Sequence, residues 1–288
     1  MAVFLGNRWV RRMLAALLLL SLAALAFFAW QQFYPVRAAD GWRVRALYED
    51  LPRAAALALD TAGDLLVSEE LGQGNGRIVR IDRHGLRSVV LQGLSKPDGL
   101  LTLAAGRGIA FSQEGGTHPV SLLQNGAVTT LFSATNVQGL WSDAPASLYA
   151  IEDRAGDGRL LHFDLGSRVT TVLRDDLNEA ESITGCPDGR LFYTEKSRDR
   201  VRQLVGDGED TTFLGGLNKP SFLLCDSRGL WVSEDSSHRA RLLLLQPDGQ
   251  LQVILSYLKA PQTLLPIADG KYLLAEGGRD RVLEISLQ

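Results

Sequence analysis

The order of apolar and polar residues divides the chain into two unequal parts. Residues 13–30 form an apolar run that only Ser21 interrupts, and three arginines (Arg8, Arg11 and Arg12) precede it. As a helix, these 18 residues reach about 27 Å, which matches the hydrocarbon thickness of a bilayer. The run therefore predicts one transmembrane helix. The apolar runs after residue 40 are short and separated by glycine turns, as in strands.

The residues that flank the predicted helix indicate its orientation. The arginines precede the run and only Arg37 follows it closely, so the N-terminus is expected in the cytoplasm. Aromatic residues between Phe27 and Tyr34 are typical of the interface at the other end. The alternative is a cleaved signal peptide, for which Ala24-Leu25-Ala26 offers a small-residue cleavage site. Both interpretations place residues 40–288 on the periplasmic, extracytoplasmic side.

One sequence unit recurs six times after residue 40. Its middle part is a glycine-rich turn and a short apolar strand, and the copies end at Glu69, Gln113, Glu152, Glu195, Glu234 and Glu276. Successive copies are 44, 39, 43, 39 and 42 residues apart, which is the length of one four-stranded propeller blade. The repeat therefore predicts an all-β fold, a six-bladed β-propeller.

The two ends of the repeat predict how the ring closes. The six units fill residues 40–288, so residues 1–39 are expected to form a cytoplasmic stub, a membrane anchor and a linker. After Glu276 the chain has residues for one strand, 281–288, where a blade needs two. Trp42–Tyr48 alternates as a strand does and is expected to pair there as the outer strand of the last blade. This clasp leaves no open sheet edge at the seam.

The composition excludes several functions. The formal charge is −3, and there is no basic excess that would indicate nucleic-acid binding. The sequence has no phosphate-binding loop, nucleophile elbow or zinc-protease motif.

The two cysteines, Cys186 and Cys225, lie 39 residues apart, which is one blade step. Neighbouring strands of a ring are expected to lie too far apart for a disulfide. We therefore predict two buried free thiols.

The repeated glutamates allow two interpretations. Carboxylates that converge on one mouth of the ring would attract a cation and raise one another's pKa. Alternatively, each glutamate accepts backbone N–H groups in the turn after its strand. Repetition in nearly every blade favours the structural role, because a binding site seldom needs so many copies of one residue. Asp98 and Glu181 break the repeat and are therefore better candidates for a site.

A second motif opens the units. It reads LSKPDGLL at 94–101, LNEAESI at 177–183, LNKPSFLL at 217–224 and LKAPQTLL at 258–265. Together with PDGRLFYTE (187–195) and CDSRGLWVSE (225–234), it resembles the senescence-marker-protein/gluconolactonase family and the related NHL and strictosidine-synthase-like propellers. The resemblance covers residues 47–288 and implies a six-bladed propeller.

The resemblance also implies which residues face the central tunnel. The residue after the motif's proline lies near the mouth where the family binds metal and substrate, and the equivalent positions here are Ala55, Asp98, Gln138, Glu181, Ser221 and Gln262. Lactonases of the family hold one divalent cation, usually Ca²⁺. The implied metal ligands are Asp98, Glu181 and Gln138, and the implied ligand-binding residues are Gln138, Ser221 and Gln262. The chain departs from the family pattern at Ala55 and at Glu181 followed by Ser221, where Asn followed by Asp is typical.

The expected function is that of a membrane-anchored, metal-dependent hydrolase of a lactone or related ester. The cation would polarise the carbonyl group and activate water, and Asp98 or Glu181 would serve as catalytic base or metal ligand. The alternative is a non-catalytic propeller that binds a small ligand or a membrane-associated partner protein.

Overall fold

The computed structural model describes residues 8–143, 145–206, 208–236 and 238–288, and the first seven residues of the predicted cytoplasmic stub lie outside this part. The chain divides into two compact units, residues 1–35 and 36–288. The first contains the helix α1 (Arg8–Phe33), whose mean hydropathy reaches 2.4 over 18 residues and which has no buried residue. Its length and composition suit a membrane span, and it contains the predicted segment 13–30.

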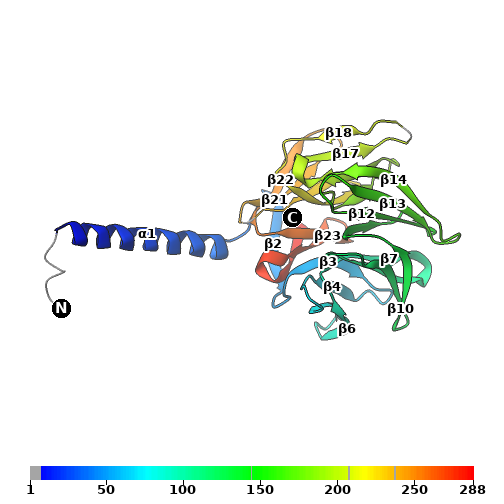
Figure 1. Ribbon diagram of the computed structural model, residues 1–288, viewed down its shortest axis with the longest axis horizontal. Coiled ribbons are helices and arrows are strands. Elements are labelled where there is room, and N and C mark those ends of the chain that lie inside the picture. Colours follow the sequence, from blue (N-terminus) through cyan, green and yellow to red (C-terminus); the bar gives the residue numbers. More distant parts are fainter. Residues whose placement is uncertain (1–7, 144, 207, 237) are drawn as a thin grey trace. The chain divides into compact units, whose positions relative to one another are not determined.

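The second unit is a six-bladed β-propeller, as the repeat predicts. Blade 1 has β3 (Ala54–Leu59), β4 (Leu65–Glu69), β5 (Gly76–Ile81) and β6 (Arg87–Leu94), and blade 2 has β7 (Pro97–Leu103), β8 (Gly108–Gln113), β9 (Pro119–Gln124) and β10 (Ala127–Ser133). Blade 3 has β11 (Val137–Trp141), β12 (Ser147–Glu152), β13 (Gly158–Asp164) and β14 (Thr170–Leu177), and blade 4 has β15 (Ile183–Gly185), β16 (Leu191–Glu195), β17 (Arg200–Leu204) and β18 (Thr211–Leu214). Blade 5 has β19 (Pro220–Asp226), β20 (Gly229–Glu234), β21 (Ala240–Leu245) and β22 (Leu251–Leu258), and blade 6 has β23 (Pro261–Ala268), β24 (Lys271–Glu276) and β25 (Arg281–Leu287). Figure 1 shows the first strands β3, β7 and β23 near the middle of the ring and β6, β10 and β18 at its rim.

The seam closes as the sequence predicts. The strand β2 (Trp42–Tyr48) pairs antiparallel with β25 and completes blade 6, with Trp42 opposite Leu287 and Tyr48 opposite Val282. A short strand that the sequence did not predict, β1 (Arg37–Ala38), pairs with β22 as a fifth strand of blade 5. The chain after α1 therefore adds to two adjacent blades before the first complete blade begins.

The core lies between neighbouring blades. Apolar residues alternate along each strand, so both faces of a sheet offer side chains to the next sheet. Leu57 and Val67 of blade 1 pack with Leu273 of blade 6, and the rings of Phe132 (blade 2) and Phe163 (blade 3) have centroids 4.7 Å apart. Each blade is thus stabilised by its two neighbours, which makes closure of the ring essential.

The repeated glutamates are buried and bind arginine. In five blades the glutamate at the end of the second strand forms an ion pair with an arginine at the start of the third: Glu69–Arg77, Glu152–Arg159, Glu195–Arg200, Glu234–Arg241 and Glu276–Arg281. Glu234 Oε1 also accepts the backbone N–H of Asn218 at 2.9 Å. The structural interpretation therefore holds, but the N–H group comes from the start of the same blade, not from the following turn.

The prediction of two free thiols is wrong, because Cys186 and Cys225 form a disulfide with their Cα atoms 4.9 Å apart. Cys186 directly follows β15, and Cys225 lies near the end of β19. Both strands are the innermost of their blades, and blades approach one another most closely next to the axis of the ring. The wider separation expected of neighbouring strands applies farther from the axis, where these two cysteines do not lie.

Removal of the disulfide is expected to destabilise the propeller by about 3 kcal/mol, because the bond closes a loop between residues 39 apart and restricts the unfolded chain. The double variant Cys186→Ser, Cys225→Ser should therefore have a lower midpoint in urea than the oxidised wild type. The reduced wild type should match the variant. An oxidised protein in which both thiols react fully with an alkylating reagent before unfolding would contradict the bond.

Candidate functional site

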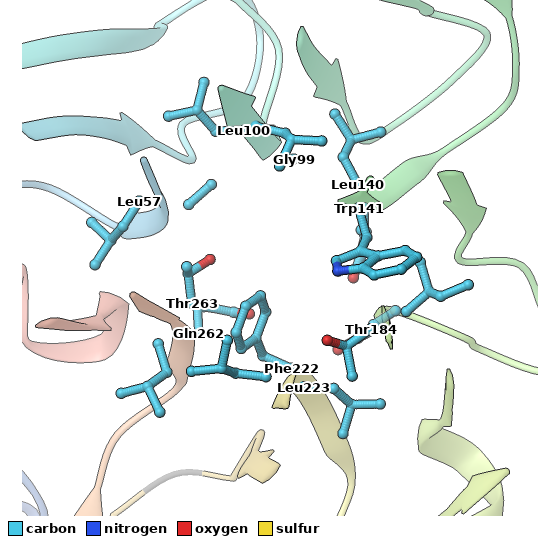
Figure 2. A pocket seen from close by; sticks show the side chains of 18 of the residues that line it. Leu57, Gly99, Leu100, Leu140, Trp141, Thr184, Phe222, Leu223, Gln262 and Thr263 are labelled. Atoms are coloured by element: carbon cyan, nitrogen blue, oxygen red, sulfur yellow. The ribbon is translucent and has the colours of Figure 1, made fainter. Parts of the chain in front are cut away.

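The innermost strands of the blades surround a central tunnel with a cavity volume of about 200 Å³. Figure 2 shows the labelled lining residues around an open centre, with the rings of Trp141 and Phe222 at its wall. Polar residues from the starts of the innermost strands line one part of the tunnel, and apolar residues such as Leu101, Leu224 and Leu265 line another. The tunnel is therefore amphipathic.

A repeated backbone irregularity turns the polar residues inward. In five blades the first two strands shift register near the start of the innermost strand, for example between Pro97 and Leu100. Such a bulge places an extra residue in one strand and redirects its side chain. A hydroxyl group of the second strand satisfies the N–H group at the bulge: Ser112 Oγ accepts the N–H of Gly99 at 3.0 Å. The inward position of Asp98 thus follows from the bulge beside it.

A left-handed residue precedes each of these tunnel positions. Arg53, Lys96, Asn136, Glu179, Lys219 and Ala260 all have φ between 45° and 53°. The carbonyl group of each accepts an N–H at 2.7–3.1 Å from the residue that follows the second strand, namely Glu70, Glu114, Asp153, Lys196, Asp235 and Gly277. This repeated bond fixes a second set of side chains at the same mouth as the first.

Two glycines allow the innermost strands to approach one another. A Cβ atom on Gly99 would lie 2.5 Å from the carbonyl oxygen of Gln138, and one on Gly185 would lie 2.4 Å from the indole of Trp141. The indole therefore packs directly on the backbone of the next blade. Its centroid is also 5.3 Å from the ring of Tyr149, and these contacts hold Trp141 in place at the tunnel wall.

The five polar residues that the sequence places at the tunnel all line it: Asp98, Gln138, Glu181, Ser221 and Gln262. Ala55 is buried. The hydroxyl group of Ser221 donates a hydrogen bond to a backbone carbonyl oxygen, that of Ser233 at 3.3 Å or that of Pro261 at 3.4 Å. The roles in catalysis, ligand binding and metal binding that the resemblance implies for these residues stay predictions.

Asp98 has a raised pKa in the tunnel. Burial, followed by the nearby carboxylates of Glu70, Glu114 and Glu181, raises the pKa of Asp98 well above its ordinary value. Within the described residues its carboxyl group has no hydrogen-bond partner. A carboxyl group that faces a cavity is available to bind a ligand, and a raised pKa favours its protonated form, which donates as well as accepts a hydrogen bond.

Glu181 forms an ion pair with Lys196, a residue that the sequence does not mark as part of the tunnel. Lys196 Nζ lies 2.5 Å from Glu181 Oε1 and 2.6 Å from Asp235 Oδ2. Burial raises the pKa of Glu181 to about 8, although Lys196 opposes the shift. Burial by itself would lower the pKa of Lys196, but the carboxylates of Glu181 and Asp235 outweigh it and raise this pKa. Lys196 therefore carries a charge at neutral pH.

A second group of charges surrounds Gln138 and Lys96. Gln138 Nε2 donates to Asp153 Oδ2 at 3.0 Å, and burial raises the pKa of Asp153 to about 6. Lys96 Nζ lies 2.7 Å from Glu114 Oε2 and 3.6 Å from Glu70 Oε1. These contacts bring the ammonium groups of Lys96 and Lys196 among the carboxyl groups of the mouth, which are those of Glu70, Asp98, Glu114, Asp153, Glu181 and Asp235.

The sequence contains a signal for Lys196. The residue after the repeated strand is acidic in four blades (Glu70, Glu114, Asp153 and Asp235), glycine in the sixth and lysine in the fourth. Lys196 is thus an irregularity within a regular framework, as Asp98 and Glu181 are. Nothing in the sequence, however, shows that the position after the repeated glutamate also faces the mouth.

These residues do not fit a resident divalent cation. Calcium takes six to eight oxygen ligands at about 2.3–2.6 Å. The ammonium group of Lys196 lies against Glu181, and the amide nitrogen of Gln138 is bonded to Asp153. No group of three or more His, Cys, Asp or Glu side chains within the described part of the chain is arranged to hold a metal ion. Calcium binding stays a prediction that a titration has to test.

No protein-family profile and no curated protein sequence matches this chain. Its fold, however, matches solved structures over most of its length. A gluconolactonase from Xanthomonas campestris is 14% identical, with a TM-score of 0.73 over 88% of this chain and 95% of that chain. The fold is that of the gluconolactonase-like propellers.

Other propellers of the same fold have different activities. A streptogramin B lyase is 13% identical, with a TM-score of 0.62 over 86% of this chain and 98% of that chain. An auxiliary nutrient binding protein from Bacteroides thetaiotaomicron is 14% identical, with a TM-score of 0.65 over 83% of this chain and 69% of that chain. At these identities the likeness concerns the fold, and function has to be argued from the site.

Proposed function

We propose that this chain is a membrane-anchored, extracytoplasmic propeller that binds a small organic ligand in its central tunnel. The observation that carries the proposal is that the carboxyl group of Asp98, which has no hydrogen-bond partner among the described residues, lines the same cavity as the rings of Trp141 and Phe222. Ligand sites typically combine apolar walls with a few directed polar groups. The cavity of about 200 Å³ suits a compact ligand with an apolar body and a hydrogen-bond acceptor at one end.

Features outside the tunnel support the rest of the proposal. The helix α1 is long and apolar enough to anchor the chain, and arginines precede its apolar part. The disulfide between Cys186 and Cys225 favours an oxidising compartment such as the periplasm. Propellers of this fold include a nutrient binding protein, which agrees with a binding role.

Hydrolysis of a lactone or related ester is the second candidate function. Asp98 and Glu181 face one tunnel, and burial raises the pKa of both. With a pKa of about 8, Glu181 can exchange a proton near neutral pH, as a general acid or base must. When a water oxygen attacks the carbonyl carbon, ionised Glu181 would accept the water's proton and Asp98 would protonate the leaving oxygen. The likeness to a gluconolactonase agrees with this chemistry, and no step of it passes through a metal.

The test combines binding with turnover. Full-length protein in detergent is titrated with small sugar lactones and aryl esters, and binding is followed by tryptophan fluorescence and thermal shift. Asp98→Ala should weaken binding about tenfold, because it removes the hydrogen bond between the carboxyl group and the ligand. The matched control is Asp175→Ala on the exposed part of β14, which should bind as the wild type does.

Turnover separates the two candidates. If the protein releases acid from these compounds in a pH-stat, and if Asp98→Asn and Glu181→Gln each abolish this release, the protein is a hydrolase. Binding without acid release would establish a binding protein. Binding that survives both Asp98→Ala and Trp141→Ala would contradict a tunnel site. If no compound of either class binds, the alternative of a membrane-associated partner protein is favoured.

A further inference from the structure

Lys196 occupies a position that the backbone prepares for a side chain at the tunnel mouth. Its N–H donates to the carbonyl group of Glu179 at 2.9 Å, and the N–H of Asp235 makes the equivalent bond to Lys219 at 2.7 Å. The two residues are therefore in the same register of adjacent blades. The backbone fixes where each side chain begins, and the sequence alone places a cation in blade 4 and an anion in blade 5.

The ammonium group joins two blades. Lys196 Nζ lies between Glu181 of its own blade and Asp235 of blade 5, at 2.5 and 2.6 Å. The side chains of these three residues are 21%, 5% and 27% exposed, so this is a largely buried ion-pair network. Exposed pairs contribute little to stability, but removal of one partner from a buried pair leaves an uncompensated charge.

We infer that Lys196 is a built-in cation. Its ammonium group takes the place between Glu181 and Asp235 where two carboxylates of adjacent blades would otherwise hold a divalent cation. The mouth of the tunnel is therefore ordered without metal, and removal of the lysine side chain exposes a latent metal site. Further oxygen ligands for a metal in Lys196 variants would come from water, which Ca²⁺ accepts readily.

The inference is independent of the proposed function, because it concerns metal binding and stability, not the ligand. The test uses full-length protein in detergent and compares the wild type with Lys196→Met, whose side chain has similar length and no charge. Thermal melts are recorded at about pH 8.5 in millimolar Ca²⁺ and in excess chelator, and Tb³⁺ luminescence reports binding to carboxylates. The matched control is Lys219→Met, because Lys219 is exposed near the same mouth.

The wild type should melt at the same temperature in Ca²⁺ and in chelator. In chelator, Lys196→Met should melt about 4–10 °C lower than the wild type, because Glu181 and Asp235 lose their counter-charge. Calcium should restore at least half of this loss, and Tb³⁺ should bind to the variant and not to the wild type. Lys219→Met should behave as the wild type in every measurement.

Three results would overturn the inference: a wild type that Ca²⁺ stabilises and chelator destabilises, a variant that melts as the wild type does, or a destabilised variant that binds neither Ca²⁺ nor Tb³⁺. If Lys196→Met fails to fold, the triple variant with Glu181→Gln and Asp235→Asn removes the two charges that the lysine balances. It should fold and show no response to metal. A triple variant that also fails to fold would assign Lys196 a packing role instead.

Discussion

A propeller that begins at residue 50 is expected to be less stable than one that begins at residue 36 by more than about 5 kcal/mol, and to unfold in more than one step. The truncation removes β2, which leaves blade 6 with three strands and an open edge at β25. It also removes Trp42, which is 7% exposed and whose ring centroid lies 5.6 Å from that of Trp231. Loss of one buried tryptophan alone costs about 3–5 kcal/mol.

Urea unfolding followed by circular dichroism measures this effect. A chain that begins at residue 41 is the matched control, because it keeps β2 and loses β1 with the short segment around it, whose Arg37 and Ala38 pair with β22 and whose Val36 and Ala39 pack on the core. This control should lose no more than about 1–2 kcal/mol, since two residues make few backbone bonds. Equal midpoints for the chains that begin at residues 50 and 36 would show that the clasp does not hold the ring together.

The second large effect is a loss of stability as the pH rises from about 5 to 9. Burial raises the pKa of Glu181 to about 8 and that of Asp153 to about 6, and it raises the pKa of Asp98 as well. The folded state therefore binds more protons than the unfolded state in this range, and stability falls as the pH rises through the folded pKa values. From Glu181 alone the loss is about 3–5 kcal/mol.

Urea midpoints at pH 5, 7 and 9 test this sign. Glu181→Gln should have a flatter dependence on pH and should be more stable than the wild type at pH 9, because the amide never has to ionise. The matched control is Glu209→Gln on the exposed loop before β18, which should keep the slope of the wild type. A wild type whose stability increases from pH 5 to pH 9 would contradict the raised pKa values.

The sequence by itself determined the architecture. The apolar run at 13–30 predicted the helix α1, and the spacing of the repeated glutamates predicted the number and order of blades. The clasp by Trp42–Tyr48 followed from the missing strand after Glu276. These features could be predicted because each depends on a local pattern of strands and turns, which repetition makes visible several times in one chain.

Only the tertiary structure decided which side chains meet near the axis. Lys196 reaches Asp235 in the next blade, and Cys186 reaches Cys225, although 39 residues separate each pair. The period of a repeat shows which positions are equivalent, but the distance between equivalent positions depends on how far they lie from the axis of the ring. That distance is set when six blades pack together, and no single unit of the sequence contains it.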